Sequence, residues 1–302
     1  MGEACEAFPR FKTDAGKARY RAAYEAALKD WPVPFEALDI ETALGPTHVI
    51  ASGPAGAPQL VLLPSFAGTA LSWRPNIAAL AQRHRCYAVD VIGQPGLSLA
   101  RRRLERPDDY APWMAELLDG LGVARAAFVG CSFGGFLAAR QALWAPERVE
   151  RVALVGPPGV FAAMSWRVAL TMGTARLRRR VRRALGDKRE PNARALHARG
   201  APQHPEDDGW RKLMGVTMAE SPEVSVTQAP VFTAAQLRRI TAPMLLLVGA
   251  YEQLYEPAAT ISRARRLKPG IEAEIVPGAD HIAAMAQPEW VNARLARFLE
   301  GD

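Results

Sequence analysis

The sequence Gly130-Cys131-Ser132-Phe133-Gly134 constrains the fold more than any other feature, because a strand-like run precedes it and a helix-like run follows it. Residues 126–129 are apolar and of strand length, whereas residues 133–145 are rich in alanine, leucine and aromatic residues that suit a helix. A sharp turn between them would hold Ser132 in a strained conformation with its hydroxyl exposed. Gly130 and Gly134 would permit this turn, because they carry no Cβ that would keep strand and helix apart. The alternative is a glycine-rich turn whose serine caps the helix.

Strand-like and helix-like segments alternate through the first half of the chain, which predicts an α/β fold with a mostly parallel sheet flanked by helices. Four expected strands, at residues 59–63, 86–90, 126–129 and 152–155, are short and almost continuously apolar, as in strands buried on both faces. Two further strands are expected at residues 244–248 and 272–276. The expected helices cover residues 76–82, 110–121, 133–145, 258–267 and 289–300. We also expect an antiparallel hairpin at the sheet edge from residues 35–42 and 47–51, and a surface helix over residues 12–28.

The regular alternation stops between residues 156 and 240, where helix-like segments rich in proline, arginine, methionine and tryptophan occur instead of strands. We therefore expect a core formed by residues 1–155 and 241–302. Residues 156–240 would be an inserted helical cap, or lid, over the edge of the sheet. A separate domain with its own core is the alternative.

The composition predicts a soluble globular protein, since 49% of the 302 residues are hydrophobic and 23% are charged. No run approaches the roughly 18 to 20 apolar residues of a membrane helix, and the first residues lack the layout of a signal peptide. The three cysteines, Cys5, Cys86 and Cys131, are an odd number without metal-like spacing. We therefore expect a cytoplasmic location, reduced thiols, no integral membrane segment and no metal.

The net charge of +7 is concentrated in two arginine-rich segments, residues 101–103 and 176–189. Apolar residues recur at helical spacing within the second segment, which predicts an amphipathic helix with a solvated basic face. Contact with an anionic lipid or an acidic partner is the alternative for this segment. No nucleic-acid partner is expected.

A serine hydroxyl is a weak nucleophile, so a catalytic Ser132 requires a general base and an acid that orients the base. His281 is the best candidate for the base, because it lies in a loop directly after the last expected strand and should reach the carboxyl edge of the sheet. Glu252 is the preferred acid, since it follows the strand at 244–248. Glu256 competes with it, whereas Asp280 is adjacent to His281 and would bend back to the ring with difficulty.

The chain order Ser132, Glu252, His281 is that of the α/β-hydrolase fold, and the chain resembles this superfamily from about residue 35 to its end. Further typical segments are residues 93–98 after Asp90, residues 145–149 after the helix that follows Ser132, and residues 277–281 and 287–289. Within the superfamily the chain most resembles bacterial carboxylesterase-like hydrolases with a helical cap.

The resemblance implies an oxyanion hole made by the backbone N–H groups of Phe66 and Phe133. Relatives usually carry His-Gly in the loop before Phe66, where this chain has Pro64-Ser65. An N–H donor survives that change, but Ser65 would adopt the backbone angles of a glycine only at a cost.

These features together predict a serine hydrolase that cleaves a carboxylic ester through an acyl-enzyme, without a metal or organic cofactor. The expected partner is a small apolar ester or related acyl compound, bound between the sheet edge and the lid. The expected pocket lining is largely apolar and consists of Ser65, Trp73, Phe161, Met164, Trp166, Met214, Met218 and Tyr251.

Two other functions fit the same fold. One is a specialised biosynthetic enzyme, such as a thioesterase, lactonase, lyase or cyclase, that acts on one metabolite. The other is a binding protein that holds a small molecule without turnover. The oligomeric state is left open, with a homodimer as one option.

Overall fold

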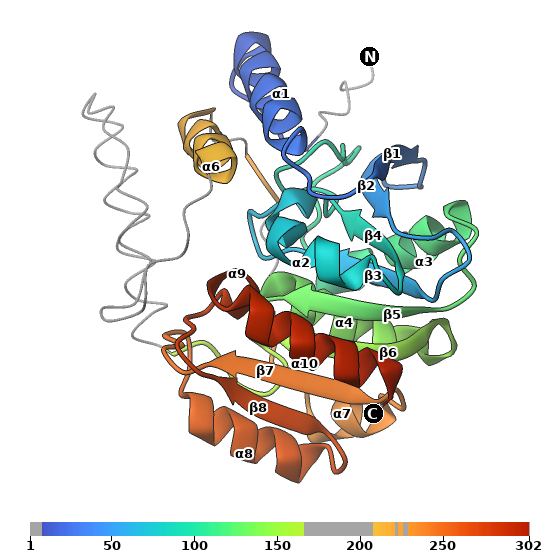
Figure 1. Ribbon diagram of the computed structural model, residues 1–302, viewed down its shortest axis with the longest axis vertical. Coiled ribbons are helices and arrows are strands. Elements are labelled where there is room, and N and C mark those ends of the chain that lie inside the picture. The colour runs from blue at the N-terminus through green and yellow to red at the C-terminus, as the bar shows by residue number, and fades with distance from the viewer. Residues whose placement is uncertain (1–7, 166–207, 221–222, 226–228, 302) are drawn as a thin grey trace.

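The structure is a computed structural model that describes residues 8–165, 208–220, 223–225 and 229–301. Within these residues the strands form one sheet in the order β1-β2-β4-β3-β5-β6-β7-β8 (Figure 1). Their bounds are β1 Phe35–Ile40, β2 Thr47–Ser52, β3 Gln59–Leu63, β4 Arg85–Val89, β5 Ala126–Cys131, β6 Val149–Val155, β7 Met244–Gly249 and β8 Glu272–Val276.

The sheet is mostly parallel. β1 pairs with β2 and β2 with β4 in antiparallel fashion, whereas all pairs from β4 to β8 are parallel. The predicted fold class and the predicted hairpin at the edge of the sheet are therefore confirmed. The order β4-β3-β5 brings the end of β3 and the end of β5 side by side.

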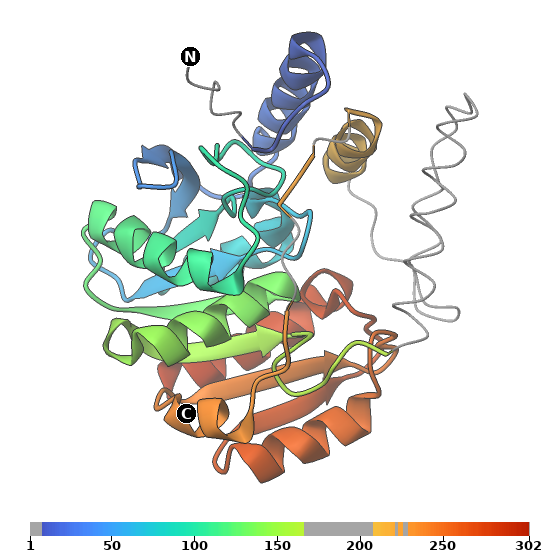
Figure 2. The same ribbon diagram turned by 180° about the vertical axis from the view of Figure 1, so that it is seen from behind.

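Helices cover both faces of the sheet. One hydrophobic cluster includes residues of α3 Tyr110–Gly120, α4 Phe133–Trp144, α7 Ala234–Arg239 and α8 Pro257–Leu267. The cluster on the other face includes residues of α1 Asp14–Leu28, α2 Arg74–Leu80, α6 Asp208–Glu220, α9 Ala283–Ala286 and α10 Pro288–Glu300. α2 and α10 lie in front of the sheet in Figure 1, and α3 and α4 lie in front in the reverse view of Figure 2. Three short 3₁₀ helices complete the described helices: η1 Ala70–Trp73, η2 Pro107–Asp109 and η3 Pro146–Arg148.

The continuous apolar runs of the central strands serve both clusters. In β3, Val61 and Leu63 belong to one cluster and Leu60 and Leu62 to the other, because successive side chains of a strand point to opposite faces. Each such fully buried aliphatic side chain stabilises the fold by about 1.5–3 kcal/mol relative to leaving it exposed. Burial on both faces therefore explains why polar and apolar residues do not alternate along these central strands.

The segment between β6 and β7 contains α6 and α7, which the sequence indicated only as helix-like regions. α6 lies beside α1 in both views, and Leu213 of α6 shares a cluster with Tyr20 and Tyr24 of α1 (Figures 1 and 2). The predicted surface helix therefore has one buried face. The predicted helix at 176–189 lies outside the described residues, and the division into core and cap stays a prediction.

The C-terminal elements close onto the first half of the chain through Asn76 of α2. Its side-chain Nδ2 donates to the Ala284 carbonyl at 3.0 Å and to Asn292 Oδ1 at 2.8 Å. Residues more than two hundred positions apart are thereby joined on one face of the sheet. None of the helices in the described part of the chain combines the length and apolar character needed to cross a bilayer.

Candidate active site

Ser132 lies at the sharp turn between β5 and α4, with φ of 51° and ψ of −115°. A Cβ added to Gly130 would lie 2.3 Å from the carbonyl carbon of Gly134, and one added to Gly134 would lie 2.2 Å from the Leu63 carbonyl oxygen. Both glycines are therefore required by the close approach of backbone to backbone. The Ser132 N–H donates to the Val155 carbonyl at 2.7 Å, which fixes the turn against β6. The predicted strained turn is confirmed, but the predicted exposure of its hydroxyl is wrong, because Ser132 is buried.

The side chain of Ser132 does not cap α4. Its Oγ instead lies 2.8 Å from Nε2 of His281. The helix-capping alternative is therefore wrong, and the serine hydroxyl is aimed at an imidazole.

Glu252 orients the other side of the His281 ring. Its Oε2 lies 2.6 Å from His281 Nδ1, while its Oε1 accepts hydrogen bonds from the N–H groups of Gln253 and Leu254, both at 2.8 Å. The Glu252 side chain is fully buried, so these contacts satisfy a carboxylate that has lost its water. The structure thus brings together the three residues predicted from the sequence, each from a loop at the carboxyl ends of β5, β7 and β8.

Glu256, the competing acid, has a different place. It is the N-cap of α8, where its carboxylate accepts hydrogen bonds from the N–H groups of Ala258 and Ala259. Such capping satisfies helix N–H groups that have no partner within the helix. Asp280 also makes a local contact, since its Oδ1 accepts from the Ile282 N–H at 3.1 Å.

The loop after β6 contributes space to the site. Gly156 has φ of 59°, and a Cβ at this position would lie 2.8 Å from the His281 carbonyl oxygen and 3.5 Å from Glu252 Oε2. A side chain here would clash with the His281 backbone carbonyl and would be strained at this φ. Gly156 therefore lets the loops after β7 and β8 meet.

Cys131 precedes Ser132 but is not prepared for nucleophilic attack. Burial raises the pKa of the Cys131 thiol to about 12, and the charges of Glu252 and Asp280 act in the same direction. The thiol is therefore protonated near neutral pH. Across the described ranges, no group of three or more His, Cys, Asp and Glu side chains is placed to hold a metal ion.

The loop after β3 faces the turn at Ser132 and forms a tight bend. The Gly68 N–H donates to the Ser65 carbonyl at 2.9 Å, and Ala67 between them has φ of 59°. The strain expected at Ser65 is therefore misplaced, because the left-handed residue is Ala67. Within the described residues, neither the Phe66 nor the Phe133 N–H donates a hydrogen bond to the protein. The two aromatic rings meet edge to face with centroids 6.2 Å apart.

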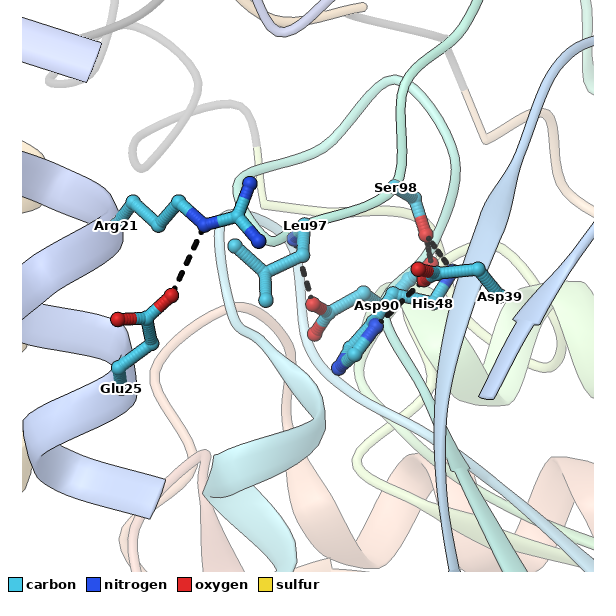
Figure 3. A network of polar contacts seen from close by, with 7 residues as sticks. All are labelled: Arg21, Glu25, Asp39, His48, Asp90, Leu97 and Ser98. Atoms are coloured by element: carbon cyan, nitrogen blue, oxygen red, sulfur yellow. Dashed lines mark hydrogen bonds and ion pairs between the residues drawn. The ribbon is translucent and has the colours of Figure 1, made fainter. Parts of the chain in front are cut away.

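A buried carboxylate fastens this loop to the loop after β4. Asp90 accepts hydrogen bonds from the N–H groups of Ala70 in η1 and Leu97, both at 2.7 Å, and Figure 3 shows the contact with Leu97. Burial raises the pKa of Asp90, while the charge of His48 and these two N–H groups oppose that rise. The sequence indicated Asp90 only as part of a typical segment, so its structural role was missed.

The same network continues to the edge hairpin. Ser98 Oγ donates to the Asp90 carbonyl at 2.6 Å and accepts from the His48 N–H at 2.8 Å. His48 Nδ1 in turn lies 2.7 Å from Oδ1 of Asp39 on β1 (Figure 3). Residues 90–98 are thus held by backbone and side-chain contacts on both sides.

Only some of the predicted pocket residues lie around a cavity. A small cavity is lined by Ser65, Ser72, Trp73, Cys131, Ile282, Ala284 and Met285, which include the chain neighbours of Ser132 and His281. Met164 and Tyr251 are exposed, whereas Phe161 is fully buried in the core. Met214 and Met218 are half-buried on α6, and Trp166 lies outside the described residues. Their role as a substrate lining stays a prediction.

Comparison with known proteins gives the family. Residues 60–294 match the alpha/beta hydrolase family. Carboxylesterase YbfK of Bacillus subtilis is 35% identical, over 94% of this chain and 94% of its own length. A second relative from that organism, described as uncharacterized carboxylesterase nap, is 33% identical over 94% and 93% of the two chains.

Solved structures agree with the sequence comparison. The crystal structure of carboxylesterase CesB (YbfK) from Bacillus subtilis has a TM-score of 0.81 at 33% identity, and covers 95% of this chain and 99% of that one. The structure of naproxen esterase from the same organism has a TM-score of 0.78 at 31% identity, with the same coverage. The order of strands, the turn at Ser132 and these relatives lead to one assignment: the chain belongs to the alpha/beta hydrolase family.

Proposed function

We propose that this protein hydrolyses carboxylic esters through an acyl-enzyme formed on Ser132. The observation that carries the proposal is the continuous contact from Ser132 Oγ to His281 Nε2 at 2.8 Å and from His281 Nδ1 to Glu252 Oε2 at 2.6 Å. A hydroxyl, an imidazole and a carboxylate in this order are the parts of a nucleophile, a general base and the group that orients the base. The names of the two carboxylesterase relatives support an ester as the substrate.

The reaction proceeds in two steps. Ser132 Oγ attacks the ester carbonyl carbon as His281 Nε2 takes its proton, and the resulting tetrahedral oxyanion collapses when the alcohol leaves with that proton. Water then attacks the acyl-enzyme carbonyl, with His281 again accepting a proton and returning it to Ser132 Oγ. The products are the alcohol and the carboxylic acid.

Glu252 serves this cycle by holding one tautomer of the imidazole. Its carboxylate accepts the proton on Nδ1, which leaves the lone pair of Nε2 free to receive the serine proton. The buried negative charge also stabilises the imidazolium that forms during attack. Because Gln253 and Leu254 hold Oε1, only Oε2 is directed at His281.

The proposed oxyanion donors are the N–H groups of Phe66 and Phe133. Their lack of hydrogen-bond partners among the described residues supports this role, since both remain able to donate to a developing oxyanion. In a site that excludes water, one such donor contributes about 3 kcal/mol to lowering the barrier.

The proposed substrate is a small apolar ester. Trp73, Ile282 and Met285 line a small cavity together with Ser65 of the loop after β3, and this largely apolar lining supports an apolar acyl or alcohol group. The relative described as naproxen esterase supports the same preference. Residues 156–240 would cover this substrate as a cap, and a cytoplasmic location stays a prediction from composition.

The test is hydrolysis of p-nitrophenyl butyrate by wild type and by Ser132→Ala, with Ser262→Ala as the matched control because Ser262 is exposed on α8. We expect Ser132→Ala to lose at least about 10⁴-fold in kcat, and the control to stay at the wild-type rate. A fluorophosphonate probe should label wild type and not Ser132→Ala. Equal rates would exclude Ser132 as the nucleophile, and an unreactive wild-type serine would favour the binding-protein alternative.

A further inference from the structure

We propose that Gln94 is a positioning residue for the loop after β3, residues 64–69, called the oxyanion loop below. Gln94 sets the geometry of this loop and connects it to Ser225 in the segment between β6 and β7. This inference rests on the proposed function, in which the Phe66 N–H is an oxyanion donor. It adds a residue that touches neither the substrate nor the three reacting side chains.

Gln94 joins two segments that lie far apart in the sequence. Its Oε1 accepts a hydrogen bond from the Ala67 N–H at 3.3 Å, and its Nε2 donates to the Ser225 carbonyl at 2.6 Å. The residue is 1% exposed, so water does not compete for either contact. A single buried amide therefore connects the oxyanion loop with Ser225, which lies in the segment between β6 and β7.

The contact at Ala67 falls where the loop needs support. Ala67 and Ser132 are the two non-glycine residues with positive φ in the described part of the chain. A left-handed alanine is disfavoured and persists only where its surroundings hold it. The Ala67 N–H belongs to the peptide group that follows Phe66, so fixing it limits rotation about the Phe66 backbone. The direction of the Phe66 N–H then depends on this support.

The other end of Gln94 is anchored to a rigid point. Ser225 is fully buried, its N–H donates to the Gly93 carbonyl at 2.8 Å, and its Oγ accepts from the Leu104 N–H at 2.9 Å. Two residues earlier, Glu223 pairs with Arg10 through backbone hydrogen bonds of 2.8 and 2.9 Å. The Ser225 carbonyl is therefore held in place by contacts that do not involve the Gln94 side chain.

The loop that carries Gln94 is also fixed. The Gln94 N–H donates to the Val91 carbonyl at 3.0 Å, and Asp90 binds the Leu97 N–H on the far side of the same loop (Figure 3). Asp90 simultaneously binds Ala70, which follows the oxyanion loop. Two side chains from one loop, Asp90 and Gln94, thus hold the oxyanion loop at two points.

The amide group suits this position because it presents an acceptor and a donor at the end of one side chain. Gln94→Met has a similar length and removes both hydrogen bonds. Gln94→Asn keeps the amide but is one methylene shorter, so it does not span from Ala67 to Ser225. Gln141→Met is the matched control, because Gln141 is also buried but its amide has no hydrogen-bond partner among the described residues.

The experiment measures kcat and KM for p-nitrophenyl butyrate, together with inhibition by a trifluoromethyl ketone and by the corresponding methyl ketone. The trifluoromethyl ketone adds to serine and places an oxyanion in the hole, whereas the methyl ketone reports ground-state binding. Thermal unfolding of each variant sets an assay temperature at which all variants are folded. Ser132→Ala is measured in parallel.

For Gln94→Met and Gln94→Asn we expect kcat to fall roughly 10- to 100-fold, less than the full loss of an oxyanion donor, with KM changed by less than about 3-fold. Affinity for the trifluoromethyl ketone should fall by the same factor as kcat, and affinity for the methyl ketone should not change. Gln141→Met should match wild type. If Gln94→Met does not fold, the kcat and ketone affinities of Gln94→Asn are the test of the proposal.

If Ser132→Ala is inactive but the folded Gln94 variants keep kcat and trifluoromethyl ketone affinity within about 2-fold of wild type, the inference on Gln94 is overturned and the proposed function stands. A parallel loss of affinity for both ketones would also overturn it, because that result shows a general loss of binding. Activity retained by Ser132→Ala would instead refute the proposed function.

Discussion

Replacing Glu252 with glutamine tests how His281 is held. The substitution preserves the shape of the side chain and changes one oxygen to an NH₂ group. The N–H groups of Gln253 and Leu254 both point at Oε1 of Glu252, so the amide oxygen must take that position. The NH₂ group is then directed at His281 Nδ1, which lies 2.6 Å from the second oxygen in the wild type.

The expected fall in kcat of Glu252→Gln follows from these contacts. An NH₂ group that donates to Nδ1 places the imidazole proton on Nε2, and this tautomer cannot accept the proton of Ser132. Rotating the amide back would set NH₂ against two N–H donors and lose two buried hydrogen bonds, at about 1–3 kcal/mol each. The productive form is therefore a few per cent at most. We expect kcat to fall by about 10²- to 10⁴-fold, which corresponds to about 3–5.5 kcal/mol in the barrier.

The assay is kcat for p-nitrophenyl butyrate, with thermal unfolding to show that the variant is folded. Glu256→Gln is the control, because Glu256 lies in the same loop region but caps α8. The control should keep wild-type kcat and lose at most about 1 kcal/mol of stability. If Glu252→Gln is folded and retains more than about a tenth of wild-type kcat, the tautomer argument is refuted.

Two further predictions concern stability. Gly134→Ala should lower the free energy of unfolding, measured in urea, by about 3 kcal/mol or more, because its Cβ would lie 2.2 Å from the Leu63 carbonyl oxygen. Gly56→Ala is the control, since its Cβ meets open space, and it should change the free energy of unfolding by less than about 1 kcal/mol. Equal effects of the two substitutions would contradict the steric explanation. Burial raises the pKa of Asp90 above its ordinary value of 3.8, so its stabilising contribution is complete below that value and is lost as pH rises through the folded pKa. The free energy of unfolding of wild type minus that of Asp90→Asn should therefore decrease as pH rises above 3.8 in urea titrations, and an increase would contradict the raised pKa.

The parts of the fold that the sequence predicts are those governed by local patterns. The run at 59–63 places apolar residues on both faces of β3, and β7 and β8 begin at the residues predicted for them, 244 and 272. Ser132, Glu252 and His281 could be chosen because each follows a predicted strand, and parallel strands end at one edge of a sheet. Their mutual contacts then follow from the topology.

What the sequence did not predict depends on contacts between distant segments. The Gln94 amide reaches Ser225 across 131 positions, and no local pattern marks such a pair. The positive φ of Ala67 arises from the bend that Gly68 closes. The strained residue is therefore Ala67, two positions after Ser65, where the resemblance led us to expect strain. The burial of one face of α1 likewise depends on α6, which lies far along the chain.

Glu252 and His281 follow Ser132 by more than a hundred residues in the chain, and this order has a consequence for synthesis. The strained turn at Ser132 is complete once Val155 has emerged from the ribosome, because that residue accepts its N–H. Glu252 and His281 are made much later, and α10 must still dock on Asn76. A nascent or C-terminally truncated chain therefore carries a serine without its proton acceptor. A nascent chain that stops before residue 281 lacks the general base that the proposed ester hydrolysis requires.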